Sequence, residues 1–215
     1  MSPRPKITEV RREQIVCAAL DVIAERGFQD TRLADIAERA GCSAPAVLYH
    51  FTAKDEILDA VVSLAEDRFY EGVEATLEQE VGPVARLVRL LESAARDDDG
   101  EETVTMWKMW LEIWTRALRE PHSAHTRQLL DRRWRGVLAE TIAEGQRAGE
   151  LPDSVAPGRV ALMLASLMDG LAVQFALGDS EVTAARMTET LMFAAERALG
   201  CALTPSRAAV AGVPR

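Results

Sequence analysis

Hydroxyl, imidazole and cationic side chains recur at short intervals between residues 31 and 54, and such groups bind anionic oxygens. Hydroxyls donate hydrogen bonds to phosphate oxygens and cations neutralise their charge, so the set is typical of a surface that meets a phosphodiester backbone. Further basic residues lie near the start of the chain, at Arg4, Lys6, Arg11 and Arg12. The candidate contacts are Thr31, Arg32, Ser43, Tyr49, His50 and Lys54, together with the small residues Ala44, Pro45 and Ala46.

Two short helices must position these residues. Apolar periodicity predicts helices over residues 33–40 and 44–51 with Gly41 at the turn, after a longer helix over 8–26 that ends at Gly27. Ser43 is a suitable N-cap, and Pro45 is tolerated in the first helical turn. This is the arrangement of a helix-turn-helix, whose second helix enters the major groove of DNA. Two short helices around a glycine also occur in bundles that bind no DNA, and spacing alone leaves that alternative open.

A second candidate site lies on the predicted helix over residues 103–119. Three tryptophans share one of its faces at i, i+3 and i+7, and tryptophans line apolar pockets well, so this face predicts the wall of an effector pocket. The alternative is that the tryptophans are ordinary core residues. The candidate pocket residues are Trp107, Trp110 and Trp114, joined by Phe69, Met168 and the polar Asp169 from other helices.

The rest of the chain continues the helical pattern, and no alternating strand pattern appears. We expect an all-α fold of about nine helices. It divides into a helix-turn-helix DNA-binding domain over residues 1–53, a helical effector-binding and dimerisation domain over 54–203, and a flexible tail over 204–215. The further helices are predicted at 54–80, 83–96, 103–119, 124–148, 156–177 and 181–199.

The last two predicted helices are candidates for a dimer interface. The helix over 156–177 is too apolar for the surface of a monomer, and the helix over 181–199 repeats apolar residues at helical spacing. Packed against the same helices of a second copy, they would form a four-helix bundle. Burial inside one subunit is the alternative. The spaced apolar residues of the final helix are Met187, Leu191, Ala194, Ala195 and Ala198.

Composition and charge exclude several classes of protein. The net charge is −9, yet residues 1–54 carry 8 basic and 7 acidic side chains. A nearly neutral N-terminal segment therefore precedes an acidic remainder of the chain. Three widely spaced cysteines predict neither a disulfide framework nor a zinc ribbon. The absence of a recognisable leader, and an aspartate within the most apolar segment, favour a cytoplasmic protein over a membrane one. No residue pattern predicts catalysis, a metal site or a cofactor.

Four motifs occur in the N-terminal part of the chain: Gly27-Phe28-Gln29-Asp30-Thr31, Asp35-Ile36-Ala37-Glu38-Arg39-Ala40-Gly41-Cys42-Ser43, Tyr49-His50-Phe51 and Lys54-Asp55-Glu56-Ile57-Leu58. With these motifs, about residues 10–60 closely resemble, without a gap, the N-terminal domain of the TetR/AcrR family of transcriptional regulators. The resemblance implies a homodimeric repressor with an N-terminal helix-turn-helix and a C-terminal helical domain that dimerises and binds an effector. A more diffuse likeness to the BetI-type branch involves Trp107 to Trp114, Trp134-Arg135, Glu144-Gly145 and Asp169-Gly170-Leu171.

Two positions depart from the family pattern. Arg32 stands where the family usually has a serine or threonine, and it could bind a phosphate directly. Leu48 stands where a tyrosine often sits, so the usual phosphate contact moves to Tyr49 or is lost. Because Ala44 and Ala46 offer only methyl groups, base reading would rest on thymine methyls with few hydrogen bonds, and the operator would be read partly by shape.

The sequence therefore predicts a DNA-binding regulator, most simply a homodimeric repressor released from a double-stranded operator by a small molecule. An effector beside the helix over 103–119 would tilt the helix over 54–80, which leads out of the DNA-binding domain. The tilt would disturb the spacing of the two DNA-binding domains in the dimer. Lys54, at the start of that helix, is predicted to bind a phosphate. The alternatives are a helical small-molecule-binding protein or enzyme with a vestigial helix-turn-helix, and a regulator without an effector.

Overall fold

The computed structural model describes residues 7–93 and 101–203, and this part of the chain is helical without strands. The predicted helix boundaries agree with it to within a few residues, which confirms the all-α prediction. Arg4, Lys6 and the tail predicted over 204–215 lie outside the described residues. The helices are α1 (Ile7–Arg26), α2 (Leu33–Arg39), α3 (Ala44–His50), α4 (Lys54–Gln79), α5 (Pro83–Glu92), α6 (Glu101–Ala117), α7 (Pro121–Arg147), α8 (Pro157–Ala176) and α9 (Ala184–Leu199).

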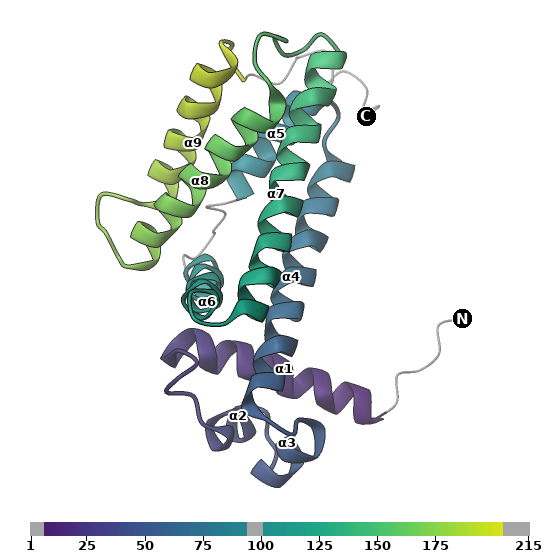
Figure 1. Cartoon of the computed structure of the whole chain (residues 1–215), viewed down its shortest axis with the longest axis vertical. Coiled ribbons are helices and arrows are strands. Elements are labelled where there is room, and N and C mark those ends of the chain that lie inside the picture. Colours follow the sequence, from purple (N-terminus) through teal and green to yellow (C-terminus); the bar gives the residue numbers. More distant parts are fainter. Residues whose placement is uncertain (1–6, 94–100, 204–215) are drawn as a thin grey trace, which may run out of the picture.

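Helices α1, α2 and α3 form a head at one end of the molecule, with α2 and α3 at its tip (Figure 1). Gly27 ends α1 with a φ of 78°, and Gly41 turns the chain between α2 and α3 with a φ of 60°. Both values lie in the left-handed region that glycine adopts most readily. Ser43 caps α3, because its side chain accepts a hydrogen bond from the Ala46 N–H at 3.3 Å. The predicted turn and cap are thus confirmed.

The long helix α4 leads from the head into the body, where it lies beside the long helix α7 (Figure 1). They are joined at mid-length, where the Tyr70 hydroxyl donates a hydrogen bond to the carbonyl of Leu130 at 3.3 Å. Arg133 of α7 pairs with Glu66 of α4, also at 3.3 Å. Helix α6 is seen nearly end-on between head and body, and it packs against α1 as well as α7 and α8. A body helix therefore touches the head directly.

The described residues bury two hydrophobic clusters, one in the head and one in the body. The head cluster contains the first turns of α4 through Ile57, Leu58 and Val61. It is closed from the other side by Met109 and Ile113 of α6, which are 2% and 3% exposed. The head core therefore continues past residue 53, the predicted end of the first domain.

Helices α8 and α9 pack on each other and leave apolar side chains at the surface. Met187, Leu191 and Ala195 are fully buried inside the protomer, so they do not form an interface as the sequence suggested. The exposed apolar residues are instead Leu162 and Met163 of α8 and Phe193 of α9. By length and composition alone α8 is apolar enough to cross a membrane, yet a third of that stretch is already buried inside the protomer.

Candidate functional site

The outer surface of α3 carries most of the predicted base contacts. Pro45 and Tyr49 are exposed, the latter to 79%, whereas Ala44, Ala46 and His50 are half-buried. The Tyr49 ring meets that of His50 edge-on, with 5.2 Å between centroids. On the opposite face Val47 is completely buried and fixes α3 to the head core. The structure thus brings these residues together at the tip of the molecule.

Thr31 and Arg32 have different environments, although both were predicted to contact DNA. Thr31 is 2% exposed, and its hydroxyl donates a hydrogen bond to the Gly27 carbonyl at 2.8 Å, so this hydroxyl does not face solvent. Arg32 is exposed at the start of α2, where its backbone N–H donates to Asp35 Oδ2 at 2.9 Å. That hydrogen bond lowers the pKa of Asp35. Thr31 holds the loop before α2, and Arg32 is the group available for a phosphate.

Lys54, which was predicted to bind a phosphate, has partners inside the protein. Its Nζ donates hydrogen bonds to the carbonyl oxygens of Phe28 and Gln29, the latter at 3.2 Å. The same ammonium lies 4.3 Å from the centroid of the Phe28 ring. Lys54 therefore ties the α1–α2 loop to the start of α4, and any phosphate must share a charge that already has partners.

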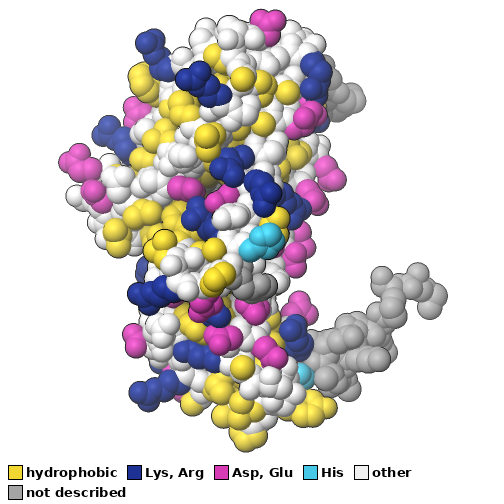
Figure 2. Space-filling view, in the orientation of Figure 1, with side chains coloured by type: hydrophobic (Ala, Val, Ile, Leu, Met, Phe, Trp, Pro, Cys, Tyr) yellow, Lys and Arg dark blue, Asp and Glu magenta, His cyan; other side chains and the backbone are white. Residues whose placement is uncertain are grey.

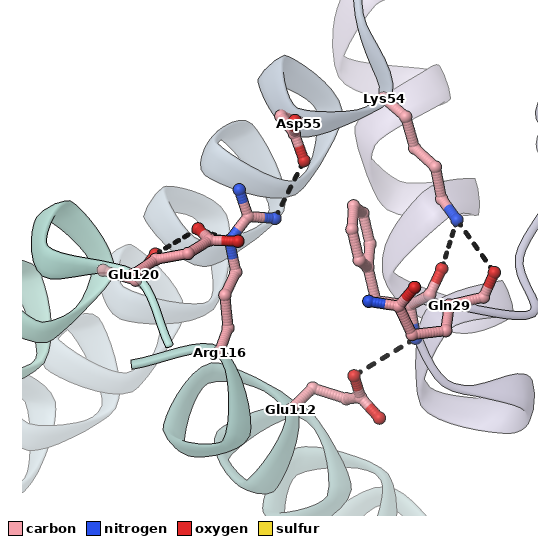
Figure 3. Close-up of polar contacts among 8 residues, drawn as sticks. Gln29, Lys54, Asp55, Glu112, Arg116 and Glu120 are labelled. Carbon is pink, nitrogen blue, oxygen red and sulfur yellow. Dashed lines mark hydrogen bonds and ion pairs between the residues drawn. The ribbon is translucent and has the colours of Figure 1, made fainter. Parts of the chain in front are cut away.

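Helix α6 holds the same loop from the side of the body (Figure 3). The Phe28 N–H donates a hydrogen bond to Glu112 Oε2 at 3.2 Å. Arg116 lies over the Phe28 ring at 5.2 Å and pairs with Asp55 of α4 at 3.1 Å. Phe28 thus lies against two cations, one from α4 and one from α6. We call these four residues, together with Lys54, the head–body junction: Phe28, Lys54, Asp55, Glu112 and Arg116.

Sequence reasoning missed this junction, apart from Lys54. Its residues come from three segments, and the contact between Phe28 and Glu112 joins positions 84 residues apart. A cavity of about 130 Å³ adjoins it, lined by Leu58, Arg119 and Glu120 besides junction residues. A shallow groove runs along α1 and α2 beside Cys17 and Arg39. Neither of these two hollows is lined by a predicted pocket residue.

The predicted effector residues form part of an aromatic cluster in the body. The Phe69 ring contacts those of Trp110 and Trp134 edge-on, with centroid distances of 6.2 and 5.2 Å. Trp107 and Met168 are buried in the body core beside them. The structure thus brings together two of the candidate pocket residues, Phe69 and Trp110, and adds Trp134, which was noted from the sequence only as part of the BetI-like pattern. Their role as a pocket stays a prediction.

Asp169 and Trp114 both contact Arg127, a residue that was not among the candidates from the sequence. The Arg127 guanidinium lies 4.3 Å from the centroid of the Trp114 ring. It also pairs with Asp131 at 3.0 Å and Asp169 at 3.5 Å. Burial raises the pKa of Asp169 to about 6, against the opposing effect of Arg127. An aromatic face and two carboxylates thus surround a cation that the protein itself supplies.

This raised pKa makes stability depend on pH. Between pH 4 and 6 the folded protein binds a proton at Asp169 that the unfolded chain releases, so the contribution of this group to the free energy of unfolding falls as pH rises. Asp169→Asn removes that dependence. We expect the melting temperature of the variant to rise relative to wild type between pH 4.5 and 7.5. A difference that stays constant across this range, or that matches the exposed control Asp153→Asn, would contradict the assignment.

Two family models match the chain. Residues 15–61 match the model for bacterial regulatory proteins of the tetR family. Residues 83–200, more than half of the chain, match the model for the C-terminal part of BetI-type transcriptional repressors. The first match contains α2 and α3, and the second contains α6 and the tryptophans of the aromatic cluster, whereas Phe69 lies between the two matched ranges.

Individual proteins agree with the family models. The HTH-type transcriptional regulator BetI of Cronobacter sakazakii is 32% identical over 178 residues, which cover 81% of this chain and 84% of the relative. A transcriptional regulator from Saccharomonospora viridis, solved in complex with choline, is 29% identical with a TM-score of 0.77, covering 84% of this chain and 92% of its own. A TetR transcription regulator from Haloarcula marismortui is 25% identical with a TM-score of 0.78, covering 88% and 98%.

Proposed function

Because this chain belongs to the TetR family of bacterial transcriptional regulators, we propose that it acts as a cytoplasmic homodimer that represses by binding an operator in double-stranded DNA, and that a small-molecule effector releases it. The observation that carries the proposal is α3, capped by Ser43 and exposed at the tip of the head. Membership in a family of regulators favours this function over an enzyme or binding protein with a vestigial helix-turn-helix.

The second copy is proposed to pack on the exposed apolar face of α8 and α9. Figure 2 shows hydrophobic side chains over these helices, and Leu162, Met163 and Phe193 are exposed there. In a dimer the same patch of both copies would meet across a two-fold axis. Two recognition helices would then face successive major grooves about one helical turn of DNA apart.

For the effector we propose a small organic cation that displaces Arg127. Aromatic faces attract quaternary ammonium groups, and the related regulator from Saccharomonospora viridis was solved with choline. In this chain the Trp114 ring and Asp169 already hold a guanidinium. A competing cation would take over these partners and free Arg127 to move. Choline is therefore the first probe to test.

The head–body junction supplies the route from this region to the DNA. Trp114 precedes Arg116 on α6 by two residues, so a displacement of α6 acts at once on the contacts to Phe28 and Asp55. Those contacts fix the α1–α2 loop and the start of α4. The effector changes the affinity for DNA only if it binds one arrangement of the junction better than the other.

The first experiment selects operators from a randomised duplex library with the purified protein. We expect an enriched palindrome, whose half-site spacing reports the separation of the two heads. Choline is then titrated against the operator complex and should weaken it, with a raised melting temperature of the free protein. No enrichment at low salt by a folded protein would overturn the DNA-binding proposal. Enrichment without any response to choline would overturn only the proposed effector.

A further inference from the structure

The outward face of α3 is mainly apolar. Pro45, Leu48 and Tyr49 are spaced i, i+3 and i+4, which places them on one face of the helix. All three are exposed, Leu48 to 49% and Tyr49 to 79%. Figure 2 shows hydrophobic side chains at the tip of the head, where α2 and α3 lie. The apolar side chains are therefore displayed where a recognition helix meets base edges.

The helix lacks the side chains that most often read bases by paired hydrogen bonds. Arginine and lysine contact guanine in this way, and asparagine and glutamine contact adenine, yet none of the four occurs in Ala44–His50. Ser43 already accepts the Ala46 N–H. Within α3 only Tyr49 and His50 carry side-chain hydrogen-bonding groups. Leu48 cannot hydrogen-bond at all, so whatever it recognises in the groove must be apolar.

The major groove displays one such group, the C5 methyl of thymine. We propose that Leu48 is a specificity-determining residue that recognises thymine through this methyl group, with Pro45 completing the apolar surface. The inference rests on the proposed function and names the feature of the DNA that α3 reads. Leu48 occupies a position where the sequence analysis noted only the loss of a tyrosine. Val47, completely buried beside it, holds the helix so that Leu48 points away from the head core.

The test removes the methyl and nothing else from the base. Each thymine of the selected operator is replaced in turn by uracil, and equilibrium affinities are measured for the full-length protein, Leu48→Ala and Leu48→Met. Loss of one buried methyl contact should weaken wild-type binding by about fourfold, or about fifteenfold when both half-sites are changed. Leu48→Met, which keeps an apolar side chain of similar size, should retain the penalty. Leu48→Ala should lose it.

Two results would overturn the inference. The first is that no uracil substitution weakens wild-type binding. The second is that uracil weakens the binding of Leu48→Ala as much as that of wild type, which would mean that another residue or the DNA shape reads that position. A reverse test uses operators that carry cytosine in place of the same thymine, and compares cytosine with 5-methylcytosine at that position. The methyl group then returns on a different base. A folded protein that selects no operator would instead refute the proposed function, and this inference with it.

Discussion

Replacing both Leu162 and Phe193 by glutamate is expected to convert the protein to a monomer and to remove tight operator binding. Both side chains are exposed in the protomer, on α8 and α9, so neither substitution disturbs its core. In the proposed dimer each glutamate would be buried against an apolar surface without a partner, which is costly for a charged group. The dimer should therefore dissociate while the protomer stays folded.

The loss of affinity follows from the two heads acting together. Once one head of the dimer is bound to its half-site, the other head is held near the second half-site at a high effective concentration. The dimer therefore binds the operator more tightly than one head alone, by a factor of about 10²–10⁴. A monomer keeps one recognition helix and loses that increase. We expect operator affinity to fall by about the same factor. Sedimentation velocity gives the molecular mass, and fluorescence anisotropy with labelled operator gives the affinity.

Leu129→Glu is the matched control for this experiment. Leu129 is as exposed as Leu162, at 49%, but lies on α7, outside the α8–α9 face. This variant should remain dimeric and bind normally. A double variant that remains a dimer would place the interface elsewhere, and a monomer that keeps full affinity would show that the heads do not depend on each other.

Phe51→Ala should unfold the head and leave the body folded. Phe51 is 1% exposed at the end of α3, in the head core, with the Arg12 guanidinium 4.8 Å from its ring centroid. Replacing a buried phenylalanine by alanine costs about 3–5 kcal/mol of unfolding free energy. That is a large part of the stability of a unit as small as the head. We expect calorimetry to show a separate early transition, lowered by more than about 10 °C, and operator binding to be lost at 37 °C.

Leu48→Ala provides the comparison for this variant, since it removes an apolar side chain from the same helix at an exposed position. Its melting profile should match that of wild type, although its base preference changes. If Phe51→Ala instead lowers one single transition for the whole chain, the two hydrophobic clusters unfold together. The head would then not be a separately melting unit.

Features set by neighbouring residues could be predicted from the sequence, and those set by distant contacts could not. Gly41 and Ser43 fix a turn and a cap within three residues, so the helix-turn-helix was predictable. The contact of Phe28 with Glu112 depends on how α6 lies across the head, which no local pattern records. The role of Lys54 in the same junction was hidden for the same reason.

The orientation of α9 shows a second kind of limit. Its apolar stripe predicts a buried face but does not say whether the protein's own core or a second copy covers it. Met187 and Leu191 turned out to face the protomer core, and Phe193 faces outward. Likewise, Thr31 has a residue type suited to phosphate, and only the fold reveals that its hydroxyl is already bonded to the Gly27 carbonyl. In each case the residue type fits both a contact inside the protein and a contact with a partner, so the sequence alone does not decide between them.

Met109 and Ile113 also limit how this regulator can be recombined with others. A head excised after α3 would leave a hole where these two side chains of α6 close its core. If this head were fused to the body of another regulator, that body would need apolar residues at the positions of Met109 and Ile113. It would also need an acidic residue at the position of Glu112 to hold the loop at Phe28. In this protein, therefore, the head and the body are not interchangeable parts, because α6 contributes to the cores of both.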